Sequence, residues 1–421
     1  MSGGPEVTEL PEARPTTIAA MTPRDDATRL DRDDPLGAFR ERFVIPDPSL
    51  VYLDGNSLGR LPRAARERIG HVVDGQWGGR LIRGWYEEWL ELPVRVGDLL
   101  GSLVGAAPGQ VIVADSTTVC LFKLASAALD LDRTRIEIVV QRDEFPTDRY
   151  VLQSLATARG LELRWLESDP VEGPTADDVA AVLTQRTALV VLSHVNYRSA
   201  AIAPLTEITS LVHDAGGLVL WDLCHSAGVL PGSLDAADVD LAVGCTYKYL
   251  NGGPGAPAFL YVAERLQQRL SQPIWGWFGR RDQFLMEQGY APAPGISSWL
   301  SGTPGVLGLA AVEEGARLTA EAGIPAIREK ARVITEYAIA LHDGRLEPLG
   351  FTLGSPRDPE RRGSHVSVRR ADAAALCLRL AEAGVLTDFR MPDTIRLGCS
   401  PLTTSYAEVW DGVDRLVALA G

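Results

Sequence analysis

Among the residues of this sequence, Lys248 is the one whose type most calls for a chemical explanation. The chain contains 41 Lys and Arg residues, and only Lys123, Lys248 and Lys330 among them are lysines. Lysine can lose its proton and act as a nucleophile or base, whereas a guanidinium effectively cannot. Lys248 stands between two tyrosines and before a glycine-rich turn, in GCTYKYLNGGPGAP. A lone lysine is by default a surface residue, so a catalytic role depends on its companions.

Several of these companions follow apolar runs that predict strands. Asp222 ends the run LVLWD, where a partly buried carboxylate needs a cationic partner. Thr117 and Thr118 precede a helical stretch, where hydroxyls and free N–H groups suit a phosphate, although they could equally cap the helix. Phe145 could stack on an aromatic ring and His225 could contact the same ligand, or both could simply fill space.

The elements that would position these residues alternate between strand and helix. From about residue 108, short apolar runs and helical stretches follow one another, which predicts an α/β fold with a mostly parallel, doubly wound sheet. In such sheets ligands bind at the carboxyl ends of the strands. Five strand ends carry polar residues, in the segments DSTT, DEFPTD, SHVNYRS, DLCHSAG and TYKYLNGGPG. We therefore expect these five segments to form the rim of one site.

The same pattern predicts how the chain is divided. The first residues are rich in Pro, Thr and acidic side chains, which predicts a flexible tail over residues 1–34. A large domain over residues 35–303 should contain the sheet and an N-terminal segment of the substrate pocket. Near residue 304 longer helical stretches and short strands begin, which predicts a smaller α+β domain over residues 304–421.

Composition argues against several classes of partner. The net charge of −14 argues against nucleic-acid binding, which needs clustered Lys and Arg. No run approaches 18 apolar residues, and the start lacks the regions of a signal peptide, so we expect a cytoplasmic protein without a membrane span. Five cysteines without a CxxC pair and six histidines without ligand spacing predict reduced thiols and no metal site.

The order of the candidate residues is typical of enzymes that use pyridoxal 5'-phosphate (PLP). Along the chain come a candidate phosphate site, an aromatic ring, a buried acid and a lysine. This is the order found in PLP enzymes of the aspartate-aminotransferase type, which have PLP fold type I. From about residue 35 to the end, nine motifs resemble the kynureninase family, in its bacterial type. They are VYLDGNSLGRLP (51–62), GGRLIRGW (78–85), EFPTDRY (144–150), SHVNYRSA (193–200), WDLCHSAG (221–228), GCTYKYLNGGPGAPAFLYV (244–262), GWFG (276–279), YAPAPGI (290–296) and LSGTPGVLGLAA (300–311).

The resemblance implies a role for each matching residue. Lys248 would bind the cofactor aldehyde covalently and act as the catalytic base, Asp222 would pair with the pyridine nitrogen, and Tyr247 would donate a proton. The implied cofactor contacts are Thr117, Thr118, Phe145, Asp148, Asp222, His225, Tyr247 and Lys248, with Trp277 and Thr303 from the neighbouring subunit. The implied substrate contacts are Asn56, Ser57, Trp77 and Gly302 around the aryl ketone and Arg396 on the α-carboxylate.

Kynureninases hydrolyse the Cβ–Cγ bond of L-kynurenine to anthranilate and L-alanine. The resemblance therefore implies this activity in a homodimer with shared active sites, in tryptophan catabolism or a specialised pathway. Cys399 and Thr403 stand where bacterial relatives carry aromatic rings, and Trp299 stands where a Phe is usual. Either Trp299 compensates for the lost volume, or the lost rings leave room for a ring-substituted kynurenine.

Three other functions remain as alternatives. A cysteine desulfurase-like lyase or class V aminotransferase would share the cofactor and fold, but the GNSLG and GWFG motifs disfavour it. A PLP-fold protein that only binds or regulates is disfavoured because the lysine, acid, arginine and tyrosine are all present. A nicotinamide-binding Rossmann protein is disfavoured because no GxGxxG opens the first strand–helix unit.

Overall fold

The computed structural model describes residues 23–421. A seven-stranded sheet with the order β2-β8-β7-β6-β5-β3-β4 lies at its centre. Neighbouring strands from β7 to β4 are parallel, and β8 runs antiparallel to both β2 and β7. The strands are β2 (Val111–Ala114), β3 (Glu137–Gln141), β4 (Glu162–Leu166), β5 (Thr187–Ser193), β6 (Leu218–Asp222), β7 (Leu241–Gly244) and β8 (Ala258–Val262).

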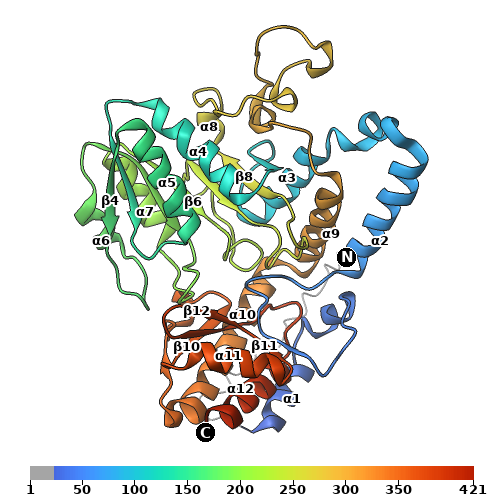
Figure 1. Cartoon of the computed structure of the whole chain (residues 1–421), viewed down its shortest axis with the longest axis vertical. Helices are drawn as coiled ribbons and strands as arrows, with labels where there is room; N and C mark the ends of the chain where they lie inside the picture. Colours follow the sequence, from blue (N-terminus) through green and yellow to red (C-terminus); the bar gives the residue numbers. More distant parts are fainter. Residues whose placement is uncertain (1–22) are drawn as a thin grey trace, which may run out of the picture.

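Helices cover this sheet and bury its strands (Figure 1). Every residue of β2, β3, β5, β7 and β8 is buried, as expected for a mostly parallel sheet between helical layers. The helices of this part are α3 (Leu92–Val104), α4 (Thr117–Leu131), α5 (Pro146–Arg159), α6 (Ala176–Val182), α7 (Leu205–Asp214) and α8 (Glu264–Gln267).

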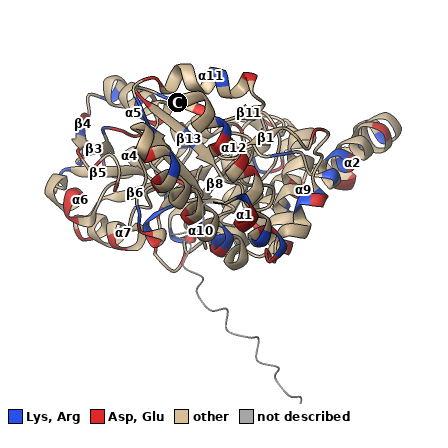
Figure 2. Cartoon of the chain, turned by 90° about the horizontal axis from the view of Figure 1, so that it is seen from below, with Lys and Arg blue, Asp and Glu red and all other residues tan. Residues whose placement is uncertain are grey.

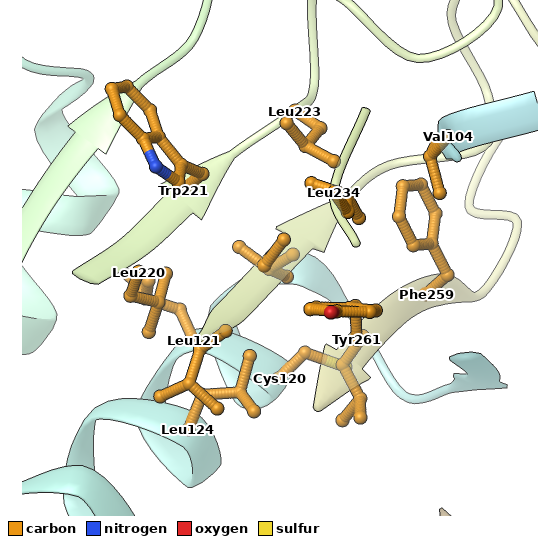
Figure 3. Close-up of a cluster of buried hydrophobic side chains, with 14 of the residues drawn as sticks. Val104, Cys120, Leu121, Leu124, Leu220, Trp221, Leu223, Leu234, Phe259 and Tyr261 are labelled. Carbon is orange, nitrogen blue, oxygen red and sulfur yellow. The ribbon is translucent and has the colours of Figure 1, made fainter. Parts of the chain in front are cut away.

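The apolar core under the middle of the sheet fixes the strand that carries Asp222. Figure 3 shows Leu220 of β6 beside Leu121 and Leu124 of α4. Trp221 is fully buried, and its indole N–H donates to Thr209 Oγ1 at 3.1 Å, which ties β6 to α7. Because successive side chains of a strand alternate, Asp222 projects from the face opposite to Trp221, at the carboxyl end of β6.

A second sheet lies below the first in Figure 1. It is antiparallel with the order β12-β13-β10-β9, and α10 and α11 pack against it while α12 packs on these two helices. Strand β1 (Val51–Tyr52) pairs in parallel with β11 (Val385–Leu386), so the segment around residue 51 joins this part of the chain. The remaining elements are β9 (Thr352–Leu353), β10 (His365–Arg369), β12 (Asp388–Arg390), β13 (Thr394–Gly398), α10 (Ile324–Leu341), α11 (Ala373–Glu382) and α12 (Tyr406–Ala420).

Helix α1 (Arg24–Arg32) corrects the prediction of a flexible tail over residues 1–34. It lies along α12, with Ala27 buried in the contact (Figure 1). Asp31 accepts hydrogen bonds from the backbone N–H groups of Tyr406 at 2.7 Å and Ala407 at 3.0 Å, at the start of α12. These polar contacts order the segment although its sequence is almost entirely polar. The part of the predicted tail over residues 1–22 lies outside the described residues.

The boundary between the two hydrophobic cores falls inside α10 rather than at residue 304. Helix α9 (Val306–Ala322) packs on α2 (Arg63–His71) and α3 and contributes to the core of the large sheet. Along α10, Ile327 belongs to that core, whereas Ile334 belongs to the core of the small sheet. Leu53 also belongs to the second core, which therefore combines residues from both ends of the described chain.

An arm and a loop project from the large part of the molecule, the arm at the right and the loop at the top of Figure 1. The arm consists of α2 (Arg63–His71), η3 (Val72–Gly78), η4 (Leu81–Arg83) and η5 (Trp85–Trp89), and the loop spans residues 274–290 with η6 (Trp277–Gly279) and η7 (Gln283–Leu285). The short helices elsewhere are η2 (Gly37–Arg42), η8 (Gly295–Trp299), η9 (His342–Leu346), η10 (Glu347–Leu349) and η11 (Pro359–Arg361).

The arm and loop expose many large apolar side chains. The rings of Tyr86 and Phe284 lie 5.5 Å apart, so the arm and the loop meet. We call the following set the arm surface: Trp77, Leu81, Ile82, Tyr86, Trp275, Trp277, Phe284, Leu285 and Met286.

Basic and acidic residues are interspersed along the ribbon in Figure 2. Among the described helices, none is long and apolar enough to cross a membrane. Within residues 23–421, His, Cys, Asp and Glu side chains form no group of three or more that could hold a metal ion.

Candidate active site

A cavity of about 140 Å³ lies at the carboxyl ends of the central strands. It receives side chains from all five segments that the sequence places after strands, and it contains Lys248. The cavity is lined by Thr117, Thr118, Phe145, Thr147, Asp148, Ser193, Tyr197, Asp222, Cys224, His225, Tyr247 and Lys248.

Lys248 follows β7 and is half-buried in this cavity. Its Nζ lies 3.3 Å from His225 Nε2 and 5.9 Å from the centre of the Tyr247 ring. Burial, and then the charge of Lys248, lower the pKa of His225 well below its usual range. His225 is therefore neutral at physiological pH and can accept a hydrogen bond from the Lys248 amine. Burial raises the pKa of the Tyr247 phenol, so its hydroxyl keeps its proton.

The loop that carries Lys248 is held by the GNSLG segment. The backbone N–H of Gly59 donates to the carbonyl of Tyr247 at 2.8 Å. A Cβ at position 59 would lie 2.3 Å from the carbonyl oxygen of Lys248 and 2.3 Å from Asn251 Oδ1. Only glycine permits this approach, so part of the motif serves to position the lysine.

Two buried carboxyl groups, Asp148 and Asp222, line the cavity, and the buried Glu144 lies next to Ser193 of its lining. Asp222 Oδ1 accepts from the backbone N–H of Cys224 at 2.6 Å. Burial, and then the charges of Asp222 and Glu144, raise the pKa of Asp148 well above its usual range. Asp148 Oδ2 is buried without a hydrogen-bond partner. This cluster of buried carboxyl groups and the unsatisfied oxygen suit a ligand that brings a cationic nitrogen and a polar substituent.

Glu144 and Ser193 were not among the predicted site residues. Glu144 accepts hydrogen bonds from Ser193 Oγ at 2.5 Å, from the Ser193 N–H at 2.7 Å and from the Phe145 N–H at 2.9 Å. Glu144 thus ties the end of β5 to the start of α5. The adjacent acids in DEFPTD were a signal of buried charge, but their orientation depends on the sheet. Phe145 itself meets Tyr197 edge to face, with ring centroids 5.4 Å apart.

The start of α4 forms the opposite end of the cavity. Ser116 caps this helix by accepting from the Val119 N–H at 3.4 Å, and Thr117 and Thr118 face the cavity. Free N–H groups and hydroxyls at a helix start suit an anionic group such as a phosphate. A phosphate site, an aromatic face at Phe145 and an acid for a ring nitrogen are therefore all present, so the residues fit PLP.

Arg396 lies on β13, behind Tyr197. Its Nη1 donates to the Tyr197 carbonyl oxygen at 2.6 Å and its Nη2 donates to Ser57 Oγ at 2.9 Å. With the side-chain amide of Asn56 in the orientation that hydrogen bonding favours, its oxygen also faces the guanidinium at 3.2 Å. The structure therefore brings together Asn56, Ser57 and Arg396, three of the five predicted substrate contacts.

Besides Asn56, Ser57 and Arg396, which lie behind Tyr197, four other predicted residues do not line the Lys248 cavity of this chain. Trp77 is exposed and lines an apolar groove of about 380 Å³ with Trp89 and Leu307. Gly302 and Thr303 line a separate groove of about 320 Å³, and Trp277 is exposed on the arm surface. The resemblance assigned Trp277 and Thr303 to the site of a neighbouring subunit.

Trp299 and Cys399 belong to the two different hydrophobic cores of this chain. Cys399 is buried in the core of the small sheet, whereas Trp299 is buried in the core of the large sheet. The Trp299 carbonyl oxygen accepts from the Lys123 amine at 2.9 Å. The interpretation of compensated drift through Trp299 and the alternative of room for a ring-substituted kynurenine both stay predictions.

Comparisons with known proteins identify the family. A family profile described as the kynureninase C-terminal domain matches residues 327–416. The chain is 42% identical over 403 residues to a kynureninase of Pseudomonas fluorescens, covering 94% of this chain and 95% of that protein. It is also 42% identical over 404 residues to a kynureninase of Burkholderia pseudomallei, with the same coverage.

Solved structures show the same fold at low sequence identity. A cysteine desulfurase from Thermococcus onnurineus matches with a TM-score of 0.78 and 18% identity over 88% of this chain and 94% of that chain. A C-DES variant with glycine covalently linked to its PLP cofactor matches with a TM-score of 0.77 and 20% identity over 89% of this chain and 99% of that chain. The prediction of an α/β, PLP fold type I architecture is thereby confirmed. With its relatives at 42% identity over nearly its full length, the chain belongs to the kynureninase family.

Proposed function

We propose that this chain is a PLP-dependent hydrolase that cleaves the Cβ–Cγ bond of L-kynurenine, or of a ring-substituted kynurenine. The products would be anthranilate, or a substituted anthranilate, and L-alanine. The observation that carries the proposal is the 42% identity to kynureninases over 94% of the chain. The cavity around Lys248 supports it, because the residue types match those the chemistry needs.

The proposed mechanism assigns one task to each group in the cavity. When bound, PLP supplies an aldehyde that an amine can attack and a ring that accepts electrons from the substrate. Thr117 and Thr118 would hold its phosphate, Phe145 would stack on its ring, and Asp222 would pair with its ring nitrogen. Lys248 Nζ, supported by neutral His225 at 3.3 Å, would take and return the proton at the substrate Cα.

Tyr247 and Arg396 complete this assignment. The Tyr247 hydroxyl keeps its proton because burial raises its pKa, so it would donate a proton to the departing alanine portion. Arg396 would bind the substrate α-carboxylate from the side of Tyr197. A water molecule would add to the γ-carbonyl carbon and leave with the anthranilate.

We further propose that the active unit is a cytoplasmic homodimer. The exposed apolar residues of the arm surface support this, because monomeric proteins rarely expose contiguous patches of this kind. Trp77, Trp277, Gly302 and Thr303 all lie away from the Lys248 cavity of their own chain, which supports their use in a second chain's site. The five free cysteines are consistent with a reducing compartment.

The test is product analysis on the PLP-loaded protein. We expect L-kynurenine to yield anthranilate and L-alanine in equal amounts, and Lys248→Arg to yield neither while its circular dichroism is unchanged. Parallel reactions with 3-hydroxykynurenine and ring-chlorinated or ring-methylated kynurenines would rank the substrates by kcat/KM. Alanine and a persulfide from L-cysteine, with sulfide released only when a thiol reductant is added, and no anthranilate from any kynurenine, would instead support the cysteine desulfurase alternative.

A further inference from the structure

Asp388 lies directly opposite Arg396 in the small sheet. The register of β12 and β13 pairs these two residues across the antiparallel ladder. Asp388 Oδ1 accepts from Arg396 Nε at 2.6 Å, and Asp388 Oδ2 accepts from Arg396 Nη2. The Arg396 side chain is 1% exposed and the Asp388 side chain 15% exposed, so this bidentate pair is largely shielded from water.

This pairing limits how Arg396 can meet a ligand. A guanidinium has five N–H groups, and the Nε/Nη2 edge is one of the two edges that can clamp a carboxylate. Asp388 fills that edge. Tyr197 and Ser57 accept from Nη1 and Nη2, the Asn56 oxygen lies 3.2 Å from Nη1, and the Nη1 end lies toward Tyr197, which lines the cavity.

We propose that Asp388 is a positioning residue for carboxylate recognition, which rests on the proposed function of the Lys248 cavity. Asp388 holds the Arg396 guanidinium in a fixed plane with its Nη1 end toward the cavity. The substrate carboxylate then binds end-on, at Nη1 and Nη2, and takes the place of Ser57 rather than that of Asp388.

Charge balance around the pair supports this role. Arg390 Nη2 lies 2.6 Å from Asp388 Oδ2, and Ser57 Oγ donates to the same oxygen at 3.0 Å. Although burial opposes ionisation, the hydrogen bonds and charge of Arg396 keep the pKa of Asp388 below its usual range. One ionised carboxylate therefore lies between two guanidinium groups. It separates the two like charges and holds them next to each other.

The experiment compares two ligands that differ only in the carboxylate, with the PLP-loaded Asp388→Asn and Asp388→Ala variants. L-Alanine and L-alaninamide binding would be followed through the absorbance of the bound cofactor. In Asp388→Asn we expect the Kd of L-alanine to rise tenfold or more and that of L-alaninamide to change less than twofold. For kynurenine we expect KM to rise tenfold while kcat changes less than threefold, and Asp388→Ala should give the same pattern.

Asp393→Asn is the matched control. Asp393 makes the same bidentate pair with Arg369, at 3.1 Å to Nε and 3.0 Å to Nη2, on the same sheet but with more exposed side chains. This variant should leave both dissociation constants unchanged.

Two results would overturn the proposal. Unchanged or tighter L-alanine binding in Asp388→Asn would mean that Asp388 is a bystander or a competitor for Arg396. Equal losses for L-alanine and L-alaninamide would mean a general structural role. Because these binding measurements need no turnover, a failure of kynurenine cleavage in the wild type is recognised separately.

Discussion

At the scale of single residues, the three rare lysines of this chain are all at least partly buried, but burial alone does not indicate a catalytic role. Lys123 is fully buried and pairs with Asp115, and Lys330 pairs with Asp34 at 2.7 Å. Lys248 differs because the amine faces a histidine and a cavity. Its neighbours after the strand ends, and not its rarity, are what support a catalytic role.

This difference predicts how the native protein reacts with an amine-directed reagent. We expect Lys248 to be modified in the PLP-free protein, because the cavity gives access to its amine. Lys123 and Lys330 should react only after unfolding. Peptide mass spectrometry measures the modification of each site, and saturating PLP should protect Lys248. Rapid modification of Lys123 in the folded protein would contradict this picture.

Arg396→Lys should cost far more than conservation of charge suggests. One ammonium group cannot replace the guanidinium contacts with Asp388, the Tyr197 carbonyl and Ser57. We expect kcat/KM for kynurenine to fall more than tenfold, roughly 1.4 kcal/mol of transition-state binding. Arg369→Lys, which alters the exposed pair with Asp393, is the control and should leave kcat/KM within twofold. A loss of less than tenfold would mean that another residue holds the carboxylate.

Asp54 lies beside the Asp388–Arg396 pair, and its titration should make the free energy of unfolding depend on pH. Burial, and then the charge of Asp388, raise the pKa of Asp54 to about 6, while Ser57, Arg396 and Arg390 lower it less. The folded protein therefore holds this proton more tightly than the unfolded chain does. Its contribution to the free energy of unfolding should fall as pH rises from about 4 to about 6.

Asp54→Asn should remove this fall. Relative to the wild type, we expect the variant to gain about 2 kcal/mol of stability between pH 4 and pH 7, as a pKa difference of this size implies. Urea unfolding of both proteins at the two pH values measures the change. An equal difference in stability at both pH values would show that Asp54 does not titrate in this range.

The sequence could predict which residue types form the site but not how all of them are paired. Asp222 and Lys248 could be predicted because each follows an apolar run whose burial is evident from composition. Asp388 was missed because its partnership with Arg396 depends on the register between β12 and β13. Short strands of mixed polarity do not specify that register locally.

At the scale of elements, α1 shows why a polar sequence can still form an ordered helix. Its contacts with the rest of the chain are mostly polar: Asp31 caps α12, and Arg24 pairs with Asp411 at 2.8 Å. The sequence of α1 therefore lacks apolar residues at helical spacing, which are the main signal for a packed helix. Most strands of the central sheet are instead apolar and buried throughout. Their apolar runs are evident in the sequence, so the alternation of strands and helices could be predicted.

Asp34, which lies just after the end of α1, allows a test of how this part of the chain contributes to stability. Asp34 pairs with Lys330 where both side chains are buried, with exposures of 3% and 5%. Asp34→Ala would leave a buried ammonium without its partner, so we expect a loss of about 3–5 kcal/mol in the free energy of unfolding. Asp33→Ala removes a neighbouring exposed acid that pairs with Arg32 and should change stability by no more than about 0.5 kcal/mol. Equal effects of the two variants in urea unfolding would argue against this contribution of the buried pair.

At the scale of the whole molecule, the residues that one chain leaves apart define the last prediction. Thr303 and Lys248 line different cavities of the same chain. In a dimer with shared sites, Lys248 of one chain would work with Thr303 of the other. Lys248→Ala and Thr303→Trp should each be inactive alone, and mixing the two chains should restore activity. Half of the randomly mixed dimers would contain one chain of each kind, with one intact site of two, so we expect about a quarter of the wild-type activity.

A second mixture separates this arrangement from simple stabilisation by a partner chain. Asp222 and Lys248 line the same cavity, so Lys248→Ala mixed with Asp222→Asn should behave differently. In a dimer with one chain of each kind, one site combines an intact Lys248 with an altered Asp222. The other site combines an altered Lys248 with an intact Asp222, so neither site is intact. Activity should stay at the level of the separate variants. Recovery in this second mixture would mean that a partner chain restores activity without completing a site. Full activity of a monomer in size-exclusion chromatography would mean that Lys248 does not depend on residues from two chains. Either result would contradict the interpretation of the first mixture.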